Sequence, residues 1–417
     1  MTEIEIRPVE GHEIDAYAAC QAAAFASRYP ADRLESLAQE LQLERTIGVF
    51  DSSGLVATSA SFLSSMTLPG LVRGEVAGVT DVSVSPTHRR RGFLTAMMRR
   101  QLDDLHASDE TIAVLYASEG AIYGRYGYAP ASFAASYVVD KRLCRLLPPG
   151  DEQTDSKVGG VAGSVRLLER NQAVEAFPLV FGAYVPTRVG EVDRPEGEWV
   201  ELLGEVSSPA MGHRFYACYE QGGRIDGYAV YRVAGIDPAD HWRRGVFLEE
   251  LCSLSDVAYR CLWRYVLGID LTEELLTTGR PVDEPVRFLL EDQRQLRTAR
   301  WTDRSWVRLV DVKRALALRR YEEQGVLVIE VSDPFCPWNE GRFVLSVDSD
   351  GVATVEPGGA EPDIVVPAEV LSSLYLGAVA FDAMAQVGRL HESASGALRR
   401  ADAMFSARRP PFCMTHF

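Results

Sequence analysis

The sequence has no long apolar run, and this shortage excludes the membrane-spanning classes of protein first. None of its 417 residues belongs to a stretch approaching the roughly 18 consecutive apolar residues that a spanning helix needs. The first ten residues are charged and mixed, which is not the pattern of a signal peptide. We therefore expect a cytoplasmic protein without a membrane span.

Cysteine and histidine are also scarce, and their spacing does not form a metal site. The seven cysteines are scattered, odd in number and without a C-x-x-C pair, so they predict reduced core thiols and not disulfides. The histidines lack H-E-x-x-H spacing, and we expect no metal. The chain also lacks G-x-x-x-x-G-K-[ST] and G-x-G-x-x-G, which excludes a P-loop and a dinucleotide fingerprint.

Basic residues are outnumbered, and this argues against nucleic acid as a partner. Against 59 acidic residues there are 43 basic ones, giving a net charge of −16. The acidic balance mildly favours cationic substrates, although it equally fits a surface that serves solubility. With 47% hydrophobic and 24% charged residues the chain is globular, and its length predicts about three domains of roughly 150 residues.

One stretch, residues 79–94, combines a strand with a basic turn and a helix start. Its sequence V-T-D-V-S-V-S-P alternates like a strand until Ser-Pro breaks it, and R-R-R-G then precedes an amphipathic helix. The first N–H groups of a helix have no partner within it, so a basic turn at that position suits a phosphate group. Taken alone, the arginines also fit a solvated surface cluster.

The remaining pattern predicts mixed α and β structure, organised in three parts. Over about the first 140 residues we expect a central sheet, which includes strands at residues 111–117 and 133–139, with a helix at residues 33–43 among others. A Pro- and Gly-rich boundary follows at residues 147–163, and the composition shifts again near residue 300. The chain ends in an apolar, aromatic segment, which predicts a docked C-terminus.

The second part repeats the order of the first without its basic turn. A strand at residues 246–253 leads into a helix at residues 256–267 through S-L-S-D, which has no arginine or glycine, and its aspartate repels phosphate. The second part therefore reads as a degenerate copy with the fold kept and the anion site lost. It predicts one cofactor per chain.

Two motifs resemble a known family. P-T-H-R-R-R-G at residues 86–92 and A-S-E-G-x-I-Y-G-R-x-G-Y at residues 117–128 are similar to the enhanced intracellular survival (Eis) acetyltransferases of the GCN5-related N-acetyltransferase superfamily. L-Y-L-G at residues 374–377 and the terminal Phe417 extend the resemblance to the whole chain. It implies an α+β fold: an acetyl-CoA-binding domain (residues 1–147), a degenerate acetyltransferase-like domain (148–302) and a sterol-carrier-like α/β domain (303–417), assembled as a homohexamer.

The resemblance also assigns roles to the residues of the two motifs. The backbone of residues 82–84 would bind the pantetheine arm of acetyl-CoA, residues 90–95 would wrap its pyrophosphate, and residues 118–119 would lie at the thioester. The residues so implied are Val82, Ser83, Val84, Arg90, Arg91, Gly92, Phe93, Leu94, Thr95, Ser118 and Glu119.

A general acid and a general base complete the implied site. Tyr123 would protonate the thiolate that leaves, although its position alone also fits a packed core aromatic. The C-terminal carboxylate of Phe417 would accept the proton of the amine. Asp81 and Glu119 are compatible with amine recognition, or with a cap and a surface charge.

The implied reaction is acetyl transfer to a primary amine, and the acceptor stays open. Aminoglycoside-like molecules and lysine side chains both fit. His416 and Arg28 stand where the family pattern leads us to expect acidic residues, so polycationic aminoglycosides should bind less well. The alternative function is an acyl-CoA or lipid-binding carrier or sensor with little turnover.

Overall fold

The computed structural model describes most of the chain, which folds into two compact units. The first unit comprises Met1–Ser132, Arg304–Pro411 and Phe417, and the second comprises Phe133–Asp303 and Phe412–His416. The described residues are 4–27, 34, 37–38, 41–148, 157–158, 161–204, 211–237, 239–240, 242–359 and 361–417. Arg28, five of the eleven residues of the helix predicted at residues 33–43, and most of the boundary at 147–163 lie outside them.

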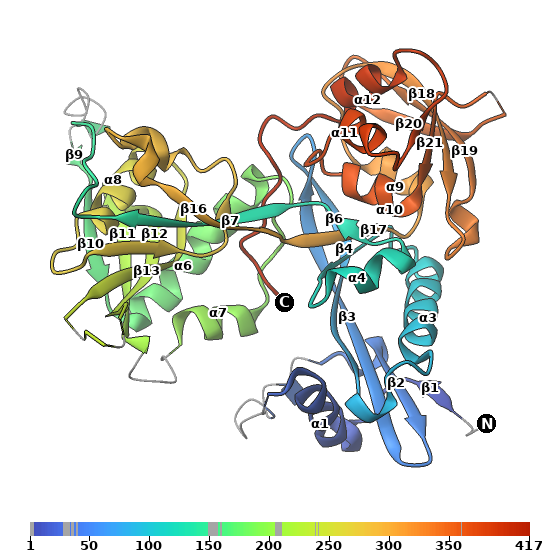
Figure 1. The fold of residues 1–417 in the computed structure, drawn as a ribbon, viewed down its shortest axis with the longest axis horizontal. Coiled ribbons are helices and arrows are strands. Elements are labelled where there is room, and N and C mark those ends of the chain that lie inside the picture. Colours follow the sequence, from blue (N-terminus) through green and yellow to red (C-terminus); the bar gives the residue numbers. More distant parts are fainter. Residues whose placement is uncertain are drawn as a thin grey trace. The chain divides into compact units, whose positions relative to one another are not determined.

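A seven-stranded sheet forms the centre of the first unit (Figure 1). Its strands, in spatial order, are β1 (Glu5–Arg7), β2 (Thr46–Asp51), β3 (Gly54–Leu68), β4 (Val72–Val84), β5 (Ile112–Tyr116), β17 (Ser305–Leu309) and β6 (Ala129–Pro130). The helices are α1 (Ile14–Phe25), α3 (Phe93–Ala107) and α4 (Gly120–Tyr123). Helix α3 packs across β2, β3 and β4 through apolar residues at helical spacing, among them Met97, Met98 and Leu102.

Two strands have exchanged sheets relative to their order in the sequence. The strand predicted at residues 133–139 is β7 (Phe133–Asp140), and its assignment to the first sheet was wrong, because it pairs with β14, β15 and β16 of the second unit. Strand β17 instead enters the first sheet between β5 and β6, antiparallel to both. Alternating apolar residues fit either sheet equally well. The sequence of a strand therefore does not show which distant strand it pairs with.

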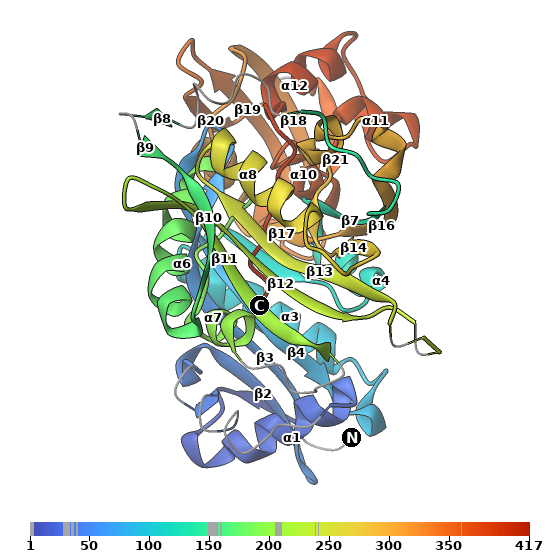
Figure 2. The same cartoon turned by 90° about the vertical axis from the view of Figure 1, so that its left-hand side faces the viewer.

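The second unit is a sheet covered by helices on both faces (Figure 2). Its strands are β7, β10 (Ser164–Leu168), β11 (His213–Gln221), β12 (Arg224–Gly235), β13 (Arg244–Ser253), β14 (Glu274–Thr277), β15 (Arg280–Pro281) and β16 (Arg297–Asp303), and β8 (Lys157–Val158) pairs separately with β9 (Val161–Ala162). Its helices are α6 (Arg170–Tyr184), α7 (Glu196–Leu203) and α8 (Asp256–Leu267). Successive strand residues alternate between faces: Ala217 and Tyr219 pack with α8, and Tyr216 and Cys218 with α6.

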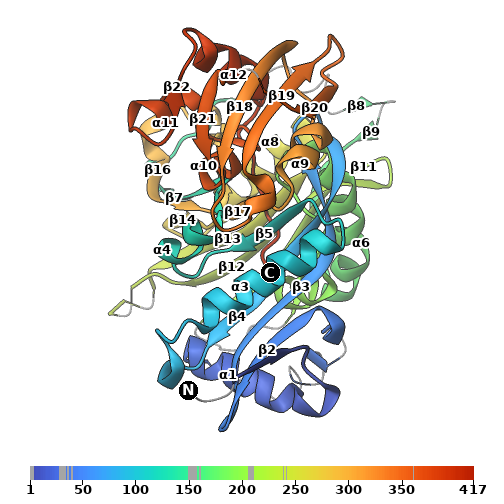
Figure 3. The same ribbon diagram turned by 90° about the vertical axis from the view of Figure 1, so that its right-hand side faces the viewer.

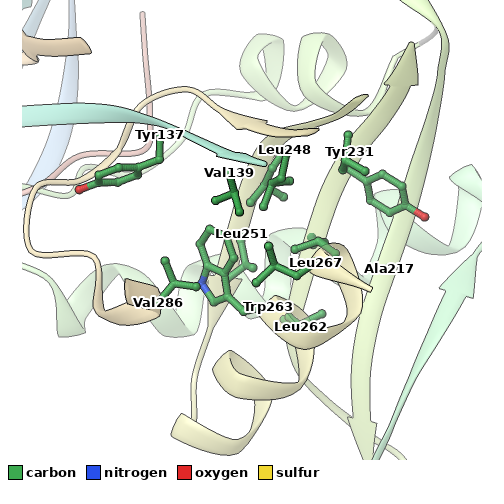
Figure 4. Close-up of a cluster of buried hydrophobic side chains, with 14 of the residues drawn as sticks. Tyr137, Val139, Ala217, Tyr231, Leu248, Leu251, Leu262, Trp263, Leu267 and Val286 are labelled. Carbon is green, nitrogen blue, oxygen red and sulfur yellow. The ribbon is translucent and has the colours of Figure 1, made fainter. Parts of the chain in front are cut away.

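The core on the α8 side of this sheet contains large side chains. Figure 4 shows Trp263 and Leu267 of α8 beside Leu248 and Val139 of the sheet, and all four are at most 8% exposed. Since Val139 belongs to β7, the exchanged strand is part of the core of its new sheet.

The C-terminal part of the first unit carries a sheet of its own (Figure 3). Its strands, in spatial order, are β20 (Ala353–Pro357), β19 (Gly341–Val347), β18 (Gly325–Ser332), β21 (Ile364–Pro367) and β22 (His391–Glu392). The helices around it are α9 (Val312–Leu318), α10 (Ala368–Leu374), α11 (Phe381–Gln386) and α12 (Ala397–Phe405). All seven cysteines are free.

Candidate active site

The first sheet opens between β4 and β5. Their parallel ladder comprises only the pairs Ala77–Ala113 and Gly78–Val114, although β4 continues to Val84. Beyond Gly78 the register between β3 and β4 shifts, and Asp81 takes a left-handed backbone conformation with a φ of +58°. This is a β-bulge, which bends the strand and increases its twist.

After the bulge, the side chains of residues 82–84 pack toward the interior of the unit. Val82 and Val84 pack against two apolar clusters, and the Ser83 hydroxyl lies 2.7 Å from Thr58 Oγ1. The groups these residues present toward β5 are therefore backbone N–H and C=O groups. An extended molecule could pair with them as an added strand does.

The predicted basic turn lies at the end of β4 and leads directly into α3. Arg90 and Gly92 both have positive φ, +64° and +87°, and Gly92 is the N-cap of α3 without a side-chain cap. Arg90 and Arg91 are exposed, and Arg89 donates to the Ala24 carbonyl at 3.2 Å. The turn thus presents two guanidinium groups beside helix N–H groups that no side chain caps.

Three of the predicted cofactor residues lie in the first turn of α3 and differ in exposure. Phe93 is buried and Leu94 half-buried, so each could contribute its backbone N–H but little of its side chain. Thr95 is exposed, and its hydroxyl lies 3.0 Å from that of Tyr126. The basic turn is therefore joined by a hydrogen bond to the segment that carries Tyr123.

Tyr123 lies in α4 in an apolar environment. Its side chain is 5% exposed, and its ring lies against Tyr128 and Trp306, with centroids 6.1 and 6.5 Å away. Burial raises the pKa of Tyr123 to about 12, while a hydrogen bond with the Ser118 side chain acts in the opposite direction. The phenol is thus held in its neutral form, in which it can donate a proton.

A buried ion pair supports the turn that carries Tyr123. Arg308 of β17 is fully buried and donates to Asp333 Oδ2 at 2.6 Å, and Asn339 donates to the same oxygen at 2.9 Å. Gly127 ends the turn with a φ of +83°, and a Cβ there would overlap the Arg308 guanidinium. Any other residue at position 127 would displace the ion pair or the turn.

The last residue of the chain docks on the first sheet. The Phe417 ring meets Phe62 of β3 and Tyr116 of β5 edge to face, with centroids 4.9 and 5.2 Å apart. Phe62 in turn packs over Gly78, the last residue of β4 that pairs with β5. The Phe417 ring thus packs on the first sheet beside the opening between β4 and β5.

The segment from Tyr116 to Ser118, at the end of β5, lies beside both predicted catalytic residues. The Tyr116 ring contacts the Phe417 ring, and the Ser118 side chain, two residues later, is near enough to the Tyr123 hydroxyl to oppose the rise in the pKa of Tyr123. Two residues of chain span at most about 7 Å. A small substrate bound at this strand end could therefore meet both groups.

The second unit has a corresponding helix N-terminus, which is capped by a side chain of the protein itself. Ser255 caps α8, its hydroxyl accepting from the Ala258 N–H at 3.2 Å, and Asp256 follows it. The contrast with Gly92 is chemical: one helix N-terminus is capped by its own side chain, and the other is not.

The remaining predicted residues give a mixed result. Glu119 and His416 are exposed, and Arg28 lies outside the described residues. Sequence reasoning missed Phe62, Tyr116 and Trp306, whose roles depend on contacts distant in the sequence.

Neither a group of metal-binding side chains nor a helix that could cross a membrane is found in the described part of the chain. It contains no group of three or more His, Cys, Asp or Glu side chains placed to hold a metal ion. None of its helices has the length and apolar character needed to cross a membrane.

Family profiles match three segments of the chain. Two profiles described as an acetyltransferase (GNAT) domain match residues 5–131 and 190–309, and one described as a sterol carrier protein domain matches residues 312–414. The order is the one implied by the two sequence motifs.

Full-length relatives agree with the profiles. The chain is 38% identical over 391 residues to an uncharacterized N-acetyltransferase of Streptomyces coelicolor, covering 92% of both chains. It is 36% identical over 350 residues to the N-acetyltransferase Eis of Mycobacterium tuberculosis, covering 83% of this chain and 81% of that one. The crystal structure of Eis1 from Mycobacterium abscessus superimposes with a TM-score of 0.85 at 33% identity, over 99% of this chain and all of that one.

These likenesses extend over nearly the whole length and include both acetyltransferase domains, which favours an enzyme over a carrier protein with little turnover. The chain belongs to the Eis family of GCN5-related N-acetyltransferases, with two GNAT domains followed by a sterol-carrier-type domain.

Proposed function

We propose that this enzyme transfers the acetyl group of acetyl-CoA to a primary amine at the end of β5. Enzymes with this domain use acyl-CoA as the co-substrate. The observation that carries the proposal is the convergence of Phe417 and Tyr123 on Tyr116 and Ser118. Acetyl-CoA would enter with its pantetheine arm along the free backbone of residues 82–84 and its pyrophosphate at Arg90, Arg91 and the α3 N-terminus.

The reaction follows from the protonation states of the two groups. The substrate ammonium loses a proton to the Phe417 carboxylate, directly or through a water molecule, and the free amine nitrogen attacks the thioester carbonyl. The tetrahedral intermediate collapses with cleavage of the C–S bond. Tyr123 donates its phenolic proton to the departing CoA thiolate. The nitrogen releases its second proton to solvent, from which the Tyr123 phenolate is reprotonated, and the product is an amide.

A carboxylate is a weak base in water, so the surroundings of Phe417 matter. Its ring lies against two aromatic rings, and Arg304 lies over the Tyr116 ring with 5.4 Å between the guanidinium carbon and the centroid. In this setting the carboxylate supplies the negative charge that attracts an alkylammonium ion as well as the acceptor for its proton.

Steady-state kinetics of three variants test the acid and the base. Tyr123→Phe should lower kcat by roughly 100-fold, and deletion of Phe417 should lower it at least as much. Tyr128→Phe is the matched control, since Tyr128 is another fully buried tyrosine of the same turn, and it should retain normal kcat. Normal rates for both the Tyr123 and the Phe417 variants would refute the assignment.

The acceptor is identified with a panel of amines. An aminoglycoside with free 2′- and 6′-amines, a lysine peptide and simple alkylamines should release thiol from acetyl-CoA at different rates. We propose that polycationic aminoglycosides are the weaker substrates, because the residue before Phe417 is His416 and not an acid. The cytoplasmic location, the homohexamer and the domain limits at residues 147 and 302 stay predictions.

A further inference from the structure

A loop of the sterol-carrier-type domain packs into the core of the acetyltransferase domain within the first unit. The loop, residues 333–339, lies between β18 and β19, inside the segment that the sterol carrier profile matches. Its side chains Phe335, Cys336 and Trp338 belong to the same apolar cluster as Tyr123. The loop therefore contributes to the surroundings of the proposed acid, although the proposed chemistry uses none of its residues.

Hydrogen bonds to Asp333 fix the shape of this loop. Its buried carboxylate accepts from the Cys336 N–H at 3.0 Å through Oδ1 and from the Asn339 side chain at 2.9 Å through Oδ2. Asn339 also donates to the Val310 carbonyl at 3.1 Å and accepts from the Val312 N–H at 2.9 Å. The loop is thereby closed on itself and attached to the segment that joins β17 to α9.

The Asp333 carboxylate also holds the guanidinium group that supports the Tyr123 turn. Arg308 donates to Asp333 Oδ2 at 2.6 Å, and both side chains are at most 2% exposed. The guanidinium lies so close to the backbone of Gly127 that a Cβ there would overlap it. A buried guanidinium is stable only where a carboxylate pairs with it, so Asp333 determines where Arg308 lies.

Phe335 contacts the Tyr123 turn and helix α3 at the same time. Its ring centroid lies 5.0 Å from that of Tyr126 and 3.8 Å from the guanidinium carbon of Arg99. Arg99 of α3 also donates to the Phe335 carbonyl. Tyr126 is hydrogen-bonded to Thr95, which lies one helical turn before Arg99. The turn is thus held to the N-terminal half of α3 by a hydrogen bond and by a ring from the other domain.

The position of the Tyr123 hydroxyl depends on these contacts. Tyr126 and Gly127 follow Tyr123 by three and four residues in the same short turn, so a shift of either residue moves the phenol. General acid catalysis needs the donor within about 2.6 to 3.2 Å of the atom that it protonates. A displacement of about 1 Å is enough to lower the rate substantially.

We propose that the loop at residues 333–339 makes the sterol-carrier-type domain part of the acetyltransferase site, with Asp333 and Phe335 as positioning residues for Tyr123. Both act through the turn that follows Tyr123, and neither touches the reacting atoms. The proposal rests on the proposed role of Tyr123 as the general acid.

Double-mutant cycles with Tyr123→Phe test the positioning role. Asp333→Asn keeps the shape of the side chain but removes the charge that holds Arg308, and Phe335→Leu keeps an apolar side chain without the ring. Each should lower kcat about tenfold with little change in the KM for acetyl-CoA. In the Tyr123→Phe background neither should cause a further loss, because the group that they position is gone. A loss that came only from a smaller folded fraction would appear in both backgrounds.

Two matched controls alter similar groups of the first unit. Glu110→Gln changes another carboxylate that pairs with a guanidinium, that of Arg45 at 2.8 Å. Phe381→Leu removes another ring of the sterol-carrier-type domain, which packs on Phe405. Both controls should retain normal kcat. Tenfold losses in the controls as well would show a general sensitivity to such changes and overturn the proposal.

The outcomes separate this proposal from the role of Tyr123. If Tyr123→Phe lowers kcat about 100-fold while Asp333→Asn and Phe335→Leu have normal kcat, or if the losses multiply in the double variants, the positioning role is refuted and the acid assignment stands. If Tyr123→Phe leaves kcat unchanged, the acid assignment fails, and the positioning role fails with it.

Amide hydrogen exchange gives a readout that does not depend on activity. Peptides that cover residues 118–128 should exchange faster in Asp333→Asn and Phe335→Leu than in the wild type, while peptides that cover α1 should exchange at the same rate. If Asp333→Asn folds poorly, Phe335→Leu serves for both tests, because it leaves the buried charge of Arg308 paired. Unchanged exchange at residues 118–128 in the folded variants would overturn the proposal.

Discussion

Replacing Asp81 with valine should both destabilise the protein and weaken its binding of acetyl-CoA. Asp81 has a φ of +58° at the bulge of β4, and its Oδ2 accepts from the Tyr17 hydroxyl of α1 at 3.0 Å. Aspartate, asparagine and glycine tolerate this left-handed conformation, whereas a β-branched residue does not. Valine would therefore favour a regular strand, which shifts the register of residues 82–84 and turns their side chains to the other face.

The magnitude follows from two contributions. The left-handed conformation costs a β-branched residue about 2 kcal/mol, and loss of the hydrogen bond to the half-buried carboxylate costs about 1.5 kcal/mol. The free energy of unfolding should therefore fall by about 3.5 kcal/mol in Asp81→Val. Asp81→Asn keeps the conformation and an acceptor and should lose under about 1 kcal/mol, while Asp81→Gly loses the bond but relaxes the backbone.

Urea unfolding and the KM for acetyl-CoA measure the two effects in the same set of variants. The difference between the glycine and valine variants isolates the backbone, since both lack the carboxylate. The KM for acetyl-CoA should rise at least about tenfold in Asp81→Val and stay normal in Asp81→Asn. A valine variant as stable as the asparagine variant, or one with a normal KM, would show that the bulge does not shape the cofactor edge.

Three other predictions concern the acid, the basic turn and the second domain. Because burial raises the pKa of Tyr123 to about 12, the neutral phenol should persist through pH of about 10, and a pH profile of kcat that falls with an apparent pKa near that of a free phenol would contradict it. Arg91→Ala should raise the KM for acetyl-CoA about tenfold but not that for acetyl-pantetheine, which lacks the diphosphate; an equal rise for both would place the pyrophosphate elsewhere. Calorimetric titration should give close to one acetyl-CoA per chain, since Ser255 already caps the corresponding helix of the second domain, and a stoichiometry near two would contradict this.

The elements predicted correctly are those that depend on local patterns. The spacing of apolar residues, together with the Pro, Gly and Ser residues at which elements begin or end, predicts the basic turn, the start of α3 and the helix over Asp256–Leu267. The bulge at Asp81 was not predictable, because it depends on how β4 aligns with β3. The sheet to which β7 belongs was predicted wrongly for the same reason. The alternation of apolar and polar residues in β7 predicts a strand but does not indicate which strand it pairs with.

The candidate site likewise contains residues that local sequence patterns predict and residues that they do not. The motif around Tyr123 identified its segment, and the apolar last residues predicted a docked C-terminus. Phe62 and Tyr116 could not be found, because an aromatic residue in an alternating strand looks the same whether or not a distant ring packs on it.

The insertion of β17 between β5 and β6 also has a consequence for synthesis. The hydroxyls of Ser132 and Ser305, 2.5 Å apart in the finished sheet, belong to residues separated by 173 positions in the chain. At a translation rate of about 5 to 20 residues per second, the N-terminal sheet waits roughly 10 to 35 s for the strand that covers β5. During that interval one edge of the apolar strand Ile112–Tyr116 is unpaired. Unpaired strand edges bind chaperones and promote aggregation. The nascent protein is thus most vulnerable after its cofactor-binding residues have been made and before they can be used.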